Sequence, residues 1–555
     1  MINGSALRDA IISGANNLTN NKKRVDELNV FPVPDGDTGT NMSMTINGAV
    51  RELVNTNDDS AGNIAEITAG ALLRNARGNS GVILSLLFRG IAKALRGHNE
   101  IGGRDFAAAL NSGVDSAYKA VMKPTEGTIL TVARLAGEKA SETAVKTDDI
   151  NEVFNDLIYA AKAALESTPE ILPVLKKAGV VDAGGQGFLY ILEGMQSVFK
   201  NGIMVESQES AVSQVNRSAA AESKAEITFT YCTEFIVKRS PEITKEPKLL
   251  RAYLETIGDS AVFVEDEHII KIHVHTDHPG KVIEKALEYG QLVNLKIDNM
   301  RDQHERARHE AEKSDKSEEM PSAGDEAEDM QPVPPANKYG FVCVAAGEGL
   351  KQLFLDLGAD KVVTGGQTMN PSTDDILKAI EATPAQTVFV LPNNKNIIMA
   401  AEQAVSLATR NVIVLNTKTI PMGLSAMLAF DEGEDADINA MAMDKAAQNI
   451  GTGQITYAAR DSEYDGHSIK KGEILAMEGS KLIFTGTDMA KAVLRLTKTI
   501  FKKHHSSITL IYGSDTTEEQ AEEISAILGQ KFGDSADVTV VNGGQPVYYY
   551  IIWTE

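Results

Sequence analysis

Apolar residues recur at helical spacing throughout the first two hundred residues of the chain. Leu7, Ile11, Ala15 and Leu18 open this series, and their spacing places them on one face of an α-helix. No stretch of this region alternates apolar and polar residues as a half-buried strand does. We therefore predict an all-α domain at residues 1–203.

A different pattern follows residue 224. Short runs rich in β-branched and aromatic residues alternate there with amphipathic helical stretches. Strands are expected at 225–238, 261–265, 269–276 and 291–298, and helices at 248–256 and 280–289. This βαββαβ order is typical of a ferredoxin-like α+β domain, here at residues 225–304, in which the first and third strands lie side by side.

From residue 338 to 555, short apolar strands alternate with helices. Strands are expected at 340–345, 361–364, 387–391 and 412–415, and helices at 350–357, 372–380, 396–407 and 424–430. Such alternation predicts an α/β domain with a parallel sheet covered on both faces. Residues after 436 are expected to form a second α/β layer with strands at 508–512 and 538–541.

Glycine and amide residues follow several of these C-terminal strands, in segments 365–370, 393–396 and 417–419. The carboxyl ends of parallel strands are where α/β sheets place ligands or partners. Ordinary loop punctuation explains the same residues about equally well. Two further stretches are interpreted as linkers between the domains, because residues 204–224 are rich in Ser, Gln, Ala and Glu and residues 305–337 are charged and then proline-rich.

Composition narrows the class of protein. The 555 residues suffice for three or four domains, and 43% hydrophobic and 24% charged residues are ordinary for a globular protein. A net charge of −23 argues against a nucleic-acid partner. Without a signal-peptide pattern or an apolar run long enough to span a bilayer, we predict a cytoplasmic protein. Cys232 and Cys343 are the only cysteines, which excludes a disulfide framework.

The stretch 29–42, with the sequence N-V-F-P-V-P-D-G-D-T-G-T-N-M, carries the first candidate chemistry. Its two prolines keep the approach extended, and Gly36 lets the chain turn tightly enough for Asp35 and Asp37 to face one spot. A divalent cation such as Mg²⁺ would neutralise the two carboxylates. The helix that follows favours anions at its N-terminus, so that Mg-nucleotide is indicated. An ordinary Asp N-cap is the plainer explanation for D-G-D alone.

Three more helices begin in the same manner, after residues 77–81, 125–128 and 182–187. Each start combines a capping residue with glycine, which lowers helix stability and is explained if the backbone approaches a ligand closely. The four starts could converge on one polyphosphate, although independent caps on a helical bundle remain the alternative. The sequence contains no G-x-x-x-x-G-K-[ST] motif, so a P-loop is excluded.

These segments, which read N-V-F-P-V-P-D-G-D-T-G, R-G-N-S-G at 77–81, E-G-T-I-L-T-V at 126–132 and D-A-G-G-Q-G at 182–187, resemble the ATP-binding domain of the dihydroxyacetone kinase superfamily. The first is most similar to the version in the kinase subunit of bacterial fatty acid kinase. The resemblance spans the first two hundred residues in four ordered motifs. It implies an eight-helix barrel that holds Mg-ATP at one end.

By the same resemblance, Asp35 and Asp37 would bind magnesium. The residues that it assigns to the nucleotide are Thr38, Gly39, Thr40, Asn41, Asn79, Ser80, Gly81, Thr128, Asp182 and Gly184. The superfamily carries a further Asp upstream, where this sequence has Asn29 one residue out of register.

A second set of candidate ligands lies on the predicted middle sheet. The period of two along 269–276 places His273 and His275 together on the face opposite the apolar residues. Cys232 takes the same face of the neighbouring first strand. One Cys and two His suit zinc, with a fourth position open to water or Glu234, whereas a reduced cysteine and two surface histidines explain the pattern about as well. The family resemblance extends through Y-C-T-E-F and H-V-H-T and favours zinc.

These observations lead to a phosphotransferase hypothesis. ATP and Mg²⁺ would phosphorylate a fatty acid carboxylate presented by a separate fatty-acid-binding protein, giving acyl phosphate for phospholipid synthesis. The acceptor is already ionised at neutral pH, so no general base is needed. The alternatives are a zinc-dependent hydrolase, a nucleotide-sensing scaffold and a dihydroxyacetone-type kinase subunit. The resemblance implies that the C-terminal domain engages the partner protein, and we expect a homodimer.

Overall fold

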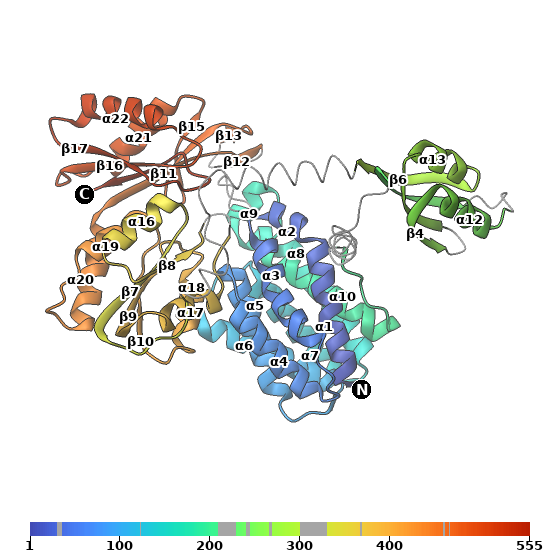
Figure 1. The fold of residues 1–555 in the computed structure, drawn as a ribbon. Helices are drawn as coiled ribbons and strands as arrows, with labels where there is room; N and C mark the ends of the chain where they lie inside the picture. The colour runs from blue at the N-terminus through green and yellow to red at the C-terminus, as the bar shows by residue number, and fades with distance from the viewer. Residues whose placement is uncertain are drawn as a thin grey trace. The chain divides into compact units, whose positions relative to one another are not determined.

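The computed structural model describes residues 1–29, 36–121, 124–208, 229–239, 245–265, 269–299, 330–366, 369–458, 461–464 and 467–555. The chain divides into two compact units. The large unit combines Met1–Ser210 with Asp329–Glu555, and the small unit is Ala211–Glu328 (Figure 1). The large unit is therefore built from both ends of the chain, and the small unit is inserted between them in sequence.

Residues 1–208, the helical domain of the large unit, form ten helices within the described residues. They are α1 (Gly4–Asn20), α2 (Lys22–Leu28), α3 (Thr38–Leu53), α4 (Ala61–Asn75), α5 (Gly78–Leu95), α6 (Gly103–Ala120), α7 (Ile129–Ala144), α8 (Ile150–Ile171), α9 (Pro173–Ala178) and α10 (Ala183–Asn201). The prediction of a helical domain is confirmed. The expectation that this domain contains only helices was wrong, because β1 (Ile2–Asn3) pairs with β2 (Glu100–Ile101). Strands of two residues are too short to show an alternating pattern in the sequence.

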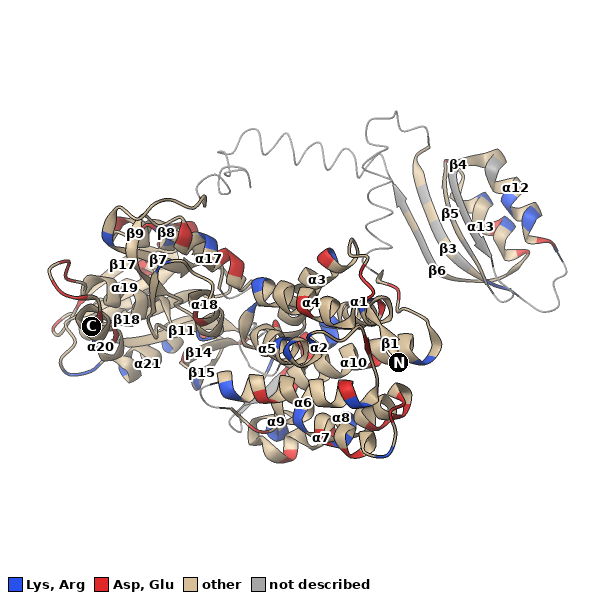
Figure 2. Cartoon of the chain, turned by 90° about the horizontal axis from the view of Figure 1, so that it is seen from below, with Lys and Arg blue, Asp and Glu red and all other residues tan. Residues whose placement is uncertain are grey.

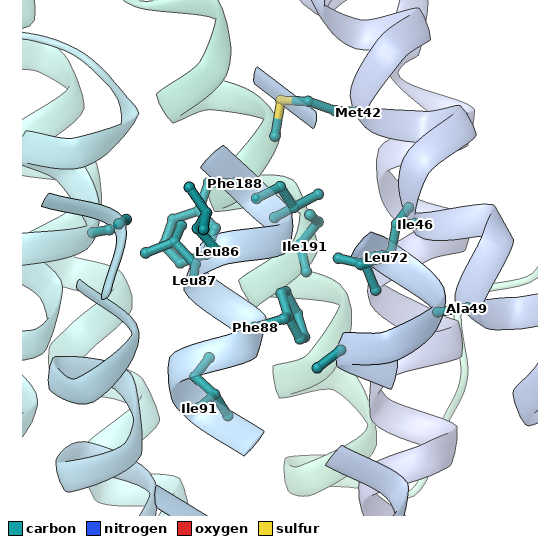
Figure 3. Close-up of a cluster of buried hydrophobic side chains, with 14 of the residues drawn as sticks. Met42, Ile46, Ala49, Leu72, Leu86, Leu87, Phe88, Ile91, Phe188 and Ile191 are labelled. Atoms are coloured by element: carbon teal, nitrogen blue, oxygen red, sulfur yellow. The ribbon is translucent and has the colours of Figure 1, made fainter. Parts of the chain in front are cut away.

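Side chains of α3, α5 and α10 meet in the core of this domain (Figure 3). Met42 and Ile46 of α3, Leu87 of α5 and Ile191 of α10 are fully or almost fully removed from solvent. A small cavity lies within this core and is lined wholly by apolar residues. Their helical spacing along each element is the reason that the sequence pattern predicts these helices correctly.

The C-terminal domain of the large unit begins with a parallel sheet, as predicted. Its elements are β7 (Asn337–Ala345), α16 (Glu348–Asp356), β8 (Lys361–Thr364), α17 (Thr373–Glu381), β9 (Ala385–Leu391), α18 (Ile398–Val405), β10 (Asn411–Val414) and α19 (Ile420–Leu428). The strands stand in the order β10-β9-β7-β8, and every pairing between them is parallel. Val342, Val344, Val388 and Val390 are buried in this sheet.

After α20 (Ala436–Asn449), the described residues form a second sheet in the order β15-β14-β11-β18-β16-β17. Its elements are β11 (Gly451–Tyr457), β14 (Ile474–Glu478), β15 (Lys481–Gly486), α21 (Met489–Ile500), β16 (Ser507–Tyr512), α22 (Glu518–Phe532), β17 (Asp537–Asn542) and β18 (Tyr550–Thr554). Only β16 and β17 pair in parallel among the described strands of this sheet. The predicted second layer is thus a separate, mainly antiparallel sheet, and residues between β11 and β14 form the short antiparallel pair β12 (Ser462–Tyr464) and β13 (His467–Ile469).

The helical and C-terminal domains share one buried apolar cluster. Residues of α17 and α18, such as Ile376 and Ala400, belong to the same cluster as Leu72 of α4 and Leu84 of α5. Helix α17 contacts α4, and α18 contacts α5. The two parts of the large unit therefore stabilise one another by burial of apolar surface as well as by polar contacts.

The small unit contains a four-stranded antiparallel sheet within its described residues, in the order β4-β5-β3-β6. Its elements are β3 (Tyr231–Arg239), α12 (Pro247–Ile257), β4 (Gly258–Glu265), β5 (Ile269–Thr276), α13 (Pro279–Leu287) and β6 (Gly290–Asn299). The predicted pairing of the first and third strands is confirmed. Most of the two predicted linkers, 204–224 and 305–337, lies outside the described residues.

Acidic and basic residues are interspersed along α6, α7 and α8 (Figure 2). Such a mixture of both signs is typical of a solvated protein surface. Among the described residues, no helix is both long enough and apolar enough to cross a membrane.

Candidate nucleotide and cation site

Asp37 lies at the start of α3 with its carboxylate turned toward the C-terminal domain. It is the N-cap residue, yet its side chain makes no capping hydrogen bond to the helix. Instead, its Oδ2 accepts a hydrogen bond from Nδ2 of Asn370 at 2.7 Å. Asp35 lies outside the described residues, so the convergence of the two carboxylates stays a prediction.

The first amides of α3 are capped by a residue that the sequence did not single out. Asp26 of α2 accepts the backbone N–H of Thr40 at 3.0 Å and the Thr40 hydroxyl at 2.8 Å. Burial raises the pKa of Asp26 above its ordinary value, and the two Thr40 bonds oppose that shift. In this structure Thr40, which the resemblance assigns to the nucleotide, is therefore engaged by a carboxylate of the protein.

The glycines at these helix starts have neighbours within the protein. A Cβ on Gly39 would lie 2.2 Å from the Lys22 carbonyl oxygen, one on Gly81 would lie 2.4 Å from Thr45 Oγ1, and one on Gly187 would lie 2.8 Å from Met42 Sδ. Close packing of one helix on another thus explains these glycines, where we had expected close approach to a ligand. The sequence pattern does not distinguish the two causes.

The start of α5 lies against the start of α3. Gly78 has a φ of +58°, and a Cβ there would be 2.7 Å from Nδ2 of Asn41. The backbone N–H of Arg77 donates to Thr45 Oγ1 at 3.2 Å. Asn41 is 3% exposed, and Asn79 and Ser80 are half-buried. Asp37, Asn41 and the glycine turn of α5 consequently form one neighbourhood.

The starts of α7 and α10 form a second neighbourhood around Asp182. This residue caps α10 by accepting the N–H of Gly185 at 2.7 Å, and the N–H of Ile129 at the start of α7 also reaches it. Burial raises the pKa of Asp182 to about 6, against the lowering effect of these two hydrogen bonds. Thr128 caps α7, since its hydroxyl accepts from Leu130 at 3.4 Å. Gly184 is buried beside Asp182.

A cluster that was missed from the sequence holds the turn before α7. Glu126 accepts hydrogen bonds from Thr131 Oγ1 at 2.7 Å and Arg134 Nη2 at 2.9 Å, and these partners lower its pKa. Thr131 Oγ1 also accepts the N–H of Gly127 at 2.7 Å. Gly127 has a φ of +82°, so the glycine is required by the turn itself.

The contact between Gly187 in α10 and Met42 in α3 joins the two neighbourhoods one turn inside the helices. The resulting arrangement combines the carboxyl groups of Asp37 and Asp182, several amides and the N-termini of α3, α5, α7 and α10. Hard oxygen donors such as the Asp37 carboxylate and the Asn41 side-chain oxygen suit Mg²⁺, and helix N-termini suit phosphate.

Two segments of the C-terminal domain contact this arrangement. Arg77 donates to the Asn370 carbonyl oxygen at 2.7 Å and forms an ion pair with Asp375 at 3.2 Å. The N–H of Thr373 donates to the Ala76 carbonyl oxygen at 3.1 Å, and Asn79 Nδ2 donates to Asn396 Oδ1 at 3.4 Å. Asn370 and Asn396 belong to segments 365–370 and 393–396, where we expected a ligand or partner, and Thr373 and Asp375 follow the first of these segments. The contact with the helical domain was not predicted.

The same strand ends border a small pocket. Its lining comes from the parallel sheet, its loops and helices, and the second sheet with its loops: Val344, Ala346, Leu350, Gly365, Gly366, Pro392, Asn393, Asn394, Ile397, Ile420, Gln545, Tyr548 and Ile551. Gly365 and Gly366 line this pocket, and Asn370, a few positions later in the chain, contacts Asp37. A strand end beside a cavity is the usual place of a ligand site in an α/β sheet.

In the small unit, the register of β3 and β5 places the backbones of the predicted zinc ligands next to one another. Cys232 pairs with His275 across β3 and β5, and Glu234 pairs with His273. Burial of Phe235, Val237, Ile270, Ile272 and Val274 confirms the predicted apolar face. Among the described residues, no group of three or more His, Cys, Asp or Glu could hold a metal ion. The side chains of Cys232 and His273 are not among those described, so zinc stays a prediction.

Three family models match successive parts of the chain. A DAK2 domain matches residues 32–197. A FakA-like middle domain and a FakA-like C-terminal domain, both of the fatty acid kinase type, match residues 228–307 and 340–555. Protein YloV of Bacillus subtilis is 41% identical over 563 aligned residues, which span 100% of this chain and 99% of YloV.

Two solved structures show only weak likenesses. A fatty-acid-binding DegV family protein from Thermus thermophilus is 11% identical with a TM-score of 0.31, over 39% of this chain and 99% of that one. The dihydroxyacetone kinase from C. freundii, in complex with AMP-PNP and Mg²⁺, is 19% identical with a TM-score of 0.28, over 34% of this chain and 33% of that one. These TM-scores are too low to bear on fold or function. The end-to-end match to YloV and the three ordered models decide the question: the chain belongs to the FakA-like family of fatty acid kinase subunits, with a DAK2 domain in its N-terminal part.

Proposed function

We propose that this chain is the kinase subunit of a fatty acid kinase, which transfers the γ-phosphate of ATP to a fatty acid carboxylate presented by a separate fatty-acid-binding protein. The product would be an acyl phosphate for phospholipid synthesis. The observation that carries the proposal is the position of Asp37 where the starts of α3 and α5 meet. Membership of a family of fatty acid kinase subunits supports the phosphotransfer chemistry and the need for a partner.

The residues present fit an Mg-nucleotide. Asp37 offers a carboxylate oxygen, and Asn41 offers an amide oxygen that is 3.5 Å from Asn370 Nδ2; both are the hard ligands that Mg²⁺ prefers. When bound, Mg²⁺ would neutralise charge on the transferring phosphoryl group. We propose that Asp35 joins Asp37 as a metal ligand and that the N-termini of α5, α7 and α10 hold the phosphates, with the eight long helices arranged as a barrel behind them.

The chain's own part in the reaction is mainly positioning. A fatty acid carboxylate is already ionised at neutral pH, so no side chain has to remove a proton from it. Amides at the helix starts would hold the phosphates in line with the acceptor, and the low solvent exposure of Asn41 and Asn370 would keep competing water out of that side of the site. Positioning and fixed dipoles of this kind supply most of the catalysis in phosphoryl transfer.

A reconstituted assay tests this function. The full chain, ATP, Mg²⁺ and a fatty-acid-loaded binding protein should together yield acyl phosphate, which hydroxylamine traps as a hydroxamate. Asp37→Ala should lower the rate at least about 100-fold, because loss of a metal ligand removes charge neutralisation in the transition state. Its melting temperature should fall only moderately, since Asp37 makes no capping bond within α3 and the variant loses one hydrogen bond, the one from Asn370.

Asp149→Ala is the matched control. Asp149 caps α8 by accepting the N–H of Asn151 at 2.9 Å, so this variant should lose about 1 kcal/mol of stability while keeping full activity. Undiminished acyl phosphate formation by Asp37→Ala would refute the metal assignment. Consumption of ATP with dihydroxyacetone but not with the loaded binding protein would assign the alternative acceptor. The zinc site and the homodimer remain predictions.

A further inference from the structure

The side chain of Asn370 joins the two domains of the large unit at Asp37. Its Nδ2 lies 2.7 Å from Asp37 Oδ2 and 3.5 Å from Asn41 Oδ1, and its backbone carbonyl accepts from Arg77. Two acceptors around Nδ2 fix the orientation of the amide, because the reversed amide would place its oxygen against a carboxylate. The residue is 0% exposed.

The carbonyl oxygen of this amide is buried without a hydrogen-bond partner. A buried acceptor in that state destabilises the fold, so the chemistry of its missing partner is informative. Phosphate oxygens at neutral pH are largely acceptors and do not satisfy another acceptor. A cation, or a water molecule that a cation holds, does satisfy it. Next to Asp37 and the Asn41 oxygen, this third hard oxygen suits a hydrated divalent cation.

We propose that Asn370 is a positioning residue of the cation site, in which its N–H group holds the Asp37 carboxylate and its carbonyl oxygen accepts from the cation's water shell. This inference rests on the proposed function and extends it, since the site then becomes a joint product of the helical domain and the C-terminal domain. A residue of the domain that we expect to meet the partner protein would set the affinity for the cation.

Mn²⁺, a paramagnetic stand-in for Mg²⁺, tests the proposal without measuring turnover. The full chain is titrated with Mn²⁺ in the presence of AMP-PNP, and free Mn²⁺ is followed by electron paramagnetic resonance. Asn370→Ala should raise the Kd for Mn²⁺ by about 10- to 100-fold, the range found when groups that orient metal ligands are removed. An unchanged Kd in this variant, with tight binding by the unmodified chain, would overturn the inference.

Asp375→Asn is the matched control. Asp375 forms the ion pair with Arg77 at the same domain contact, and the asparagine keeps an oxygen for the N–H of Ser372, which Asp375 accepts at 2.8 Å. This variant should bind Mn²⁺ within about twofold of the unmodified chain. An equal loss of affinity in both variants would mean that Asn370 acts only through domain docking. If Asp37→Ala instead binds Mn²⁺ and AMP-PNP normally, the proposed function itself fails.

A second variant decides the matter if Asn370→Ala does not fold. Asn370→Asp would place another carboxylate within hydrogen-bonding distance of Asp37, so the two charges repel each other until a cation neutralises them. Its melting temperature should be below that of the unmodified chain without Mn²⁺, and Mn²⁺ with AMP-PNP should raise it by more degrees than in the unmodified chain. A rise that is equal or smaller would contradict a cation at this position.

Discussion

Gly78 holds a backbone conformation that residues with a Cβ avoid. Its φ is +58°, and its missing Cβ leaves room for the Asn41 amide, which would otherwise lie 2.7 Å away. Gly78→Ala should therefore lower the free energy of unfolding by about 1–2 kcal/mol. It should also raise the Kd for ATP about tenfold or more, because Asn41 has to move. Urea denaturation and nucleotide titration measure the two effects.

Gly97 provides the control for Gly78. Its φ is +82°, and a Cβ there would meet nothing within 4 Å. Gly97→Ala should lose similar stability while binding ATP as the unmodified chain does. A Gly78→Ala protein with normal ATP affinity would show that the contact between Asn41 and the α5 start has no part in nucleotide binding.

Asp182 gives the site a dependence on pH. Its pKa is raised to about 6 in the folded chain from an ordinary 3.8, so the folded state holds the proton more tightly than the unfolded state does. The carboxyl therefore stabilises the fold fully below about pH 4 and loses that contribution as the pH rises through 6. The difference in unfolding free energy between the unmodified chain and Asp182→Asn, measured in urea, should fall steadily between pH 4 and 6.

Asp488 caps α21, and there the N–H of Lys491 lowers the carboxyl pKa. Its contribution has the opposite sign, because it is present above pH 4 and is lost as the pH falls. Asp488→Asn should accordingly cost more stability at pH 7 than at pH 3. For Asp182, the raised pKa would be contradicted if the unfolding free energy of the unmodified chain, relative to that of Asp182→Asn, increased from pH 4 to 6.

At the level of single residues, the short motifs identify several of the side chains that the helical domain contributes to the candidate site. Asp37, Asn41, Asn79, Thr128 and Asp182 could be named because each stands in a short motif at a helix start. Two pairings could not be predicted, because Asp26 stands 14 positions before Thr40 and Asn370 stands 333 positions after Asp37. Asn370 does belong to segment 365–370, where we expected a ligand or partner. Neither separation has a periodic or local signature, and only the tertiary fold brings these side chains together.

Among the helices, α1 and α10 cross at unusually close range. A Cβ on Gly194 would lie 2.6 Å from both the Gly14 Cα and the Ser13 carbonyl oxygen, which are backbone atoms. Gly194→Ala should thus force the helices apart and lower the free energy of unfolding by about 1–3 kcal/mol. Gly529 lies in α22, where a Cβ would meet nothing within 4 Å. Gly529→Ala should raise stability by about 0.5–1 kcal/mol through helix propensity.

Thermal and urea denaturation of both glycine variants measure this contrast. If Gly194→Ala were as stable as Gly529→Ala, the close crossing of α1 and α10 would be wrong. The contrast is sharp because both substitutions replace a helical glycine with alanine and differ only in what the new methyl group meets.

Elements were predictable where the pattern is local. Helices and the parallel strands β7 to β10 follow from apolar spacing and from short connections. The second sheet could not be assembled from the sequence, because β11 pairs with β18 through Gly451 and Thr554, about a hundred positions apart in the chain. Strand order of this kind depends on tertiary packing, which no window of the sequence contains.

For the whole molecule, Arg77 is the polar centre of the contact between the two domains of the large unit. It donates to Asn370 and pairs with Asp375, with side-chain exposures of 18% and 42% for the pair. Partial exposure weakens such a pair, so Arg77→Ala should lower the free energy of unfolding by about 1–2 kcal/mol. Differential scanning calorimetry should show the loss in the transition of the large unit.

Arg96 is the control, because its 2.7 Å pair with Glu66 is exposed at 75% and 45%. Arg96→Ala should change stability by less than about 0.5 kcal/mol. Equal effects of the two arginine variants would mean that the contact at Arg77 contributes little to holding the domains together.

The large unit is made of the two ends of the chain, and this order has a consequence for biosynthesis. Asp37 and Asn370 are 333 positions apart, so at about 5–20 residues per second a ribosome needs about 15–70 s to add the second after the first. During this interval the nascent helices lack Ile376 and Ala400, which later share their buried cluster. The helical domain is thus synthesised before the residues that complete its apolar cluster, and it reaches its final packing only late in translation.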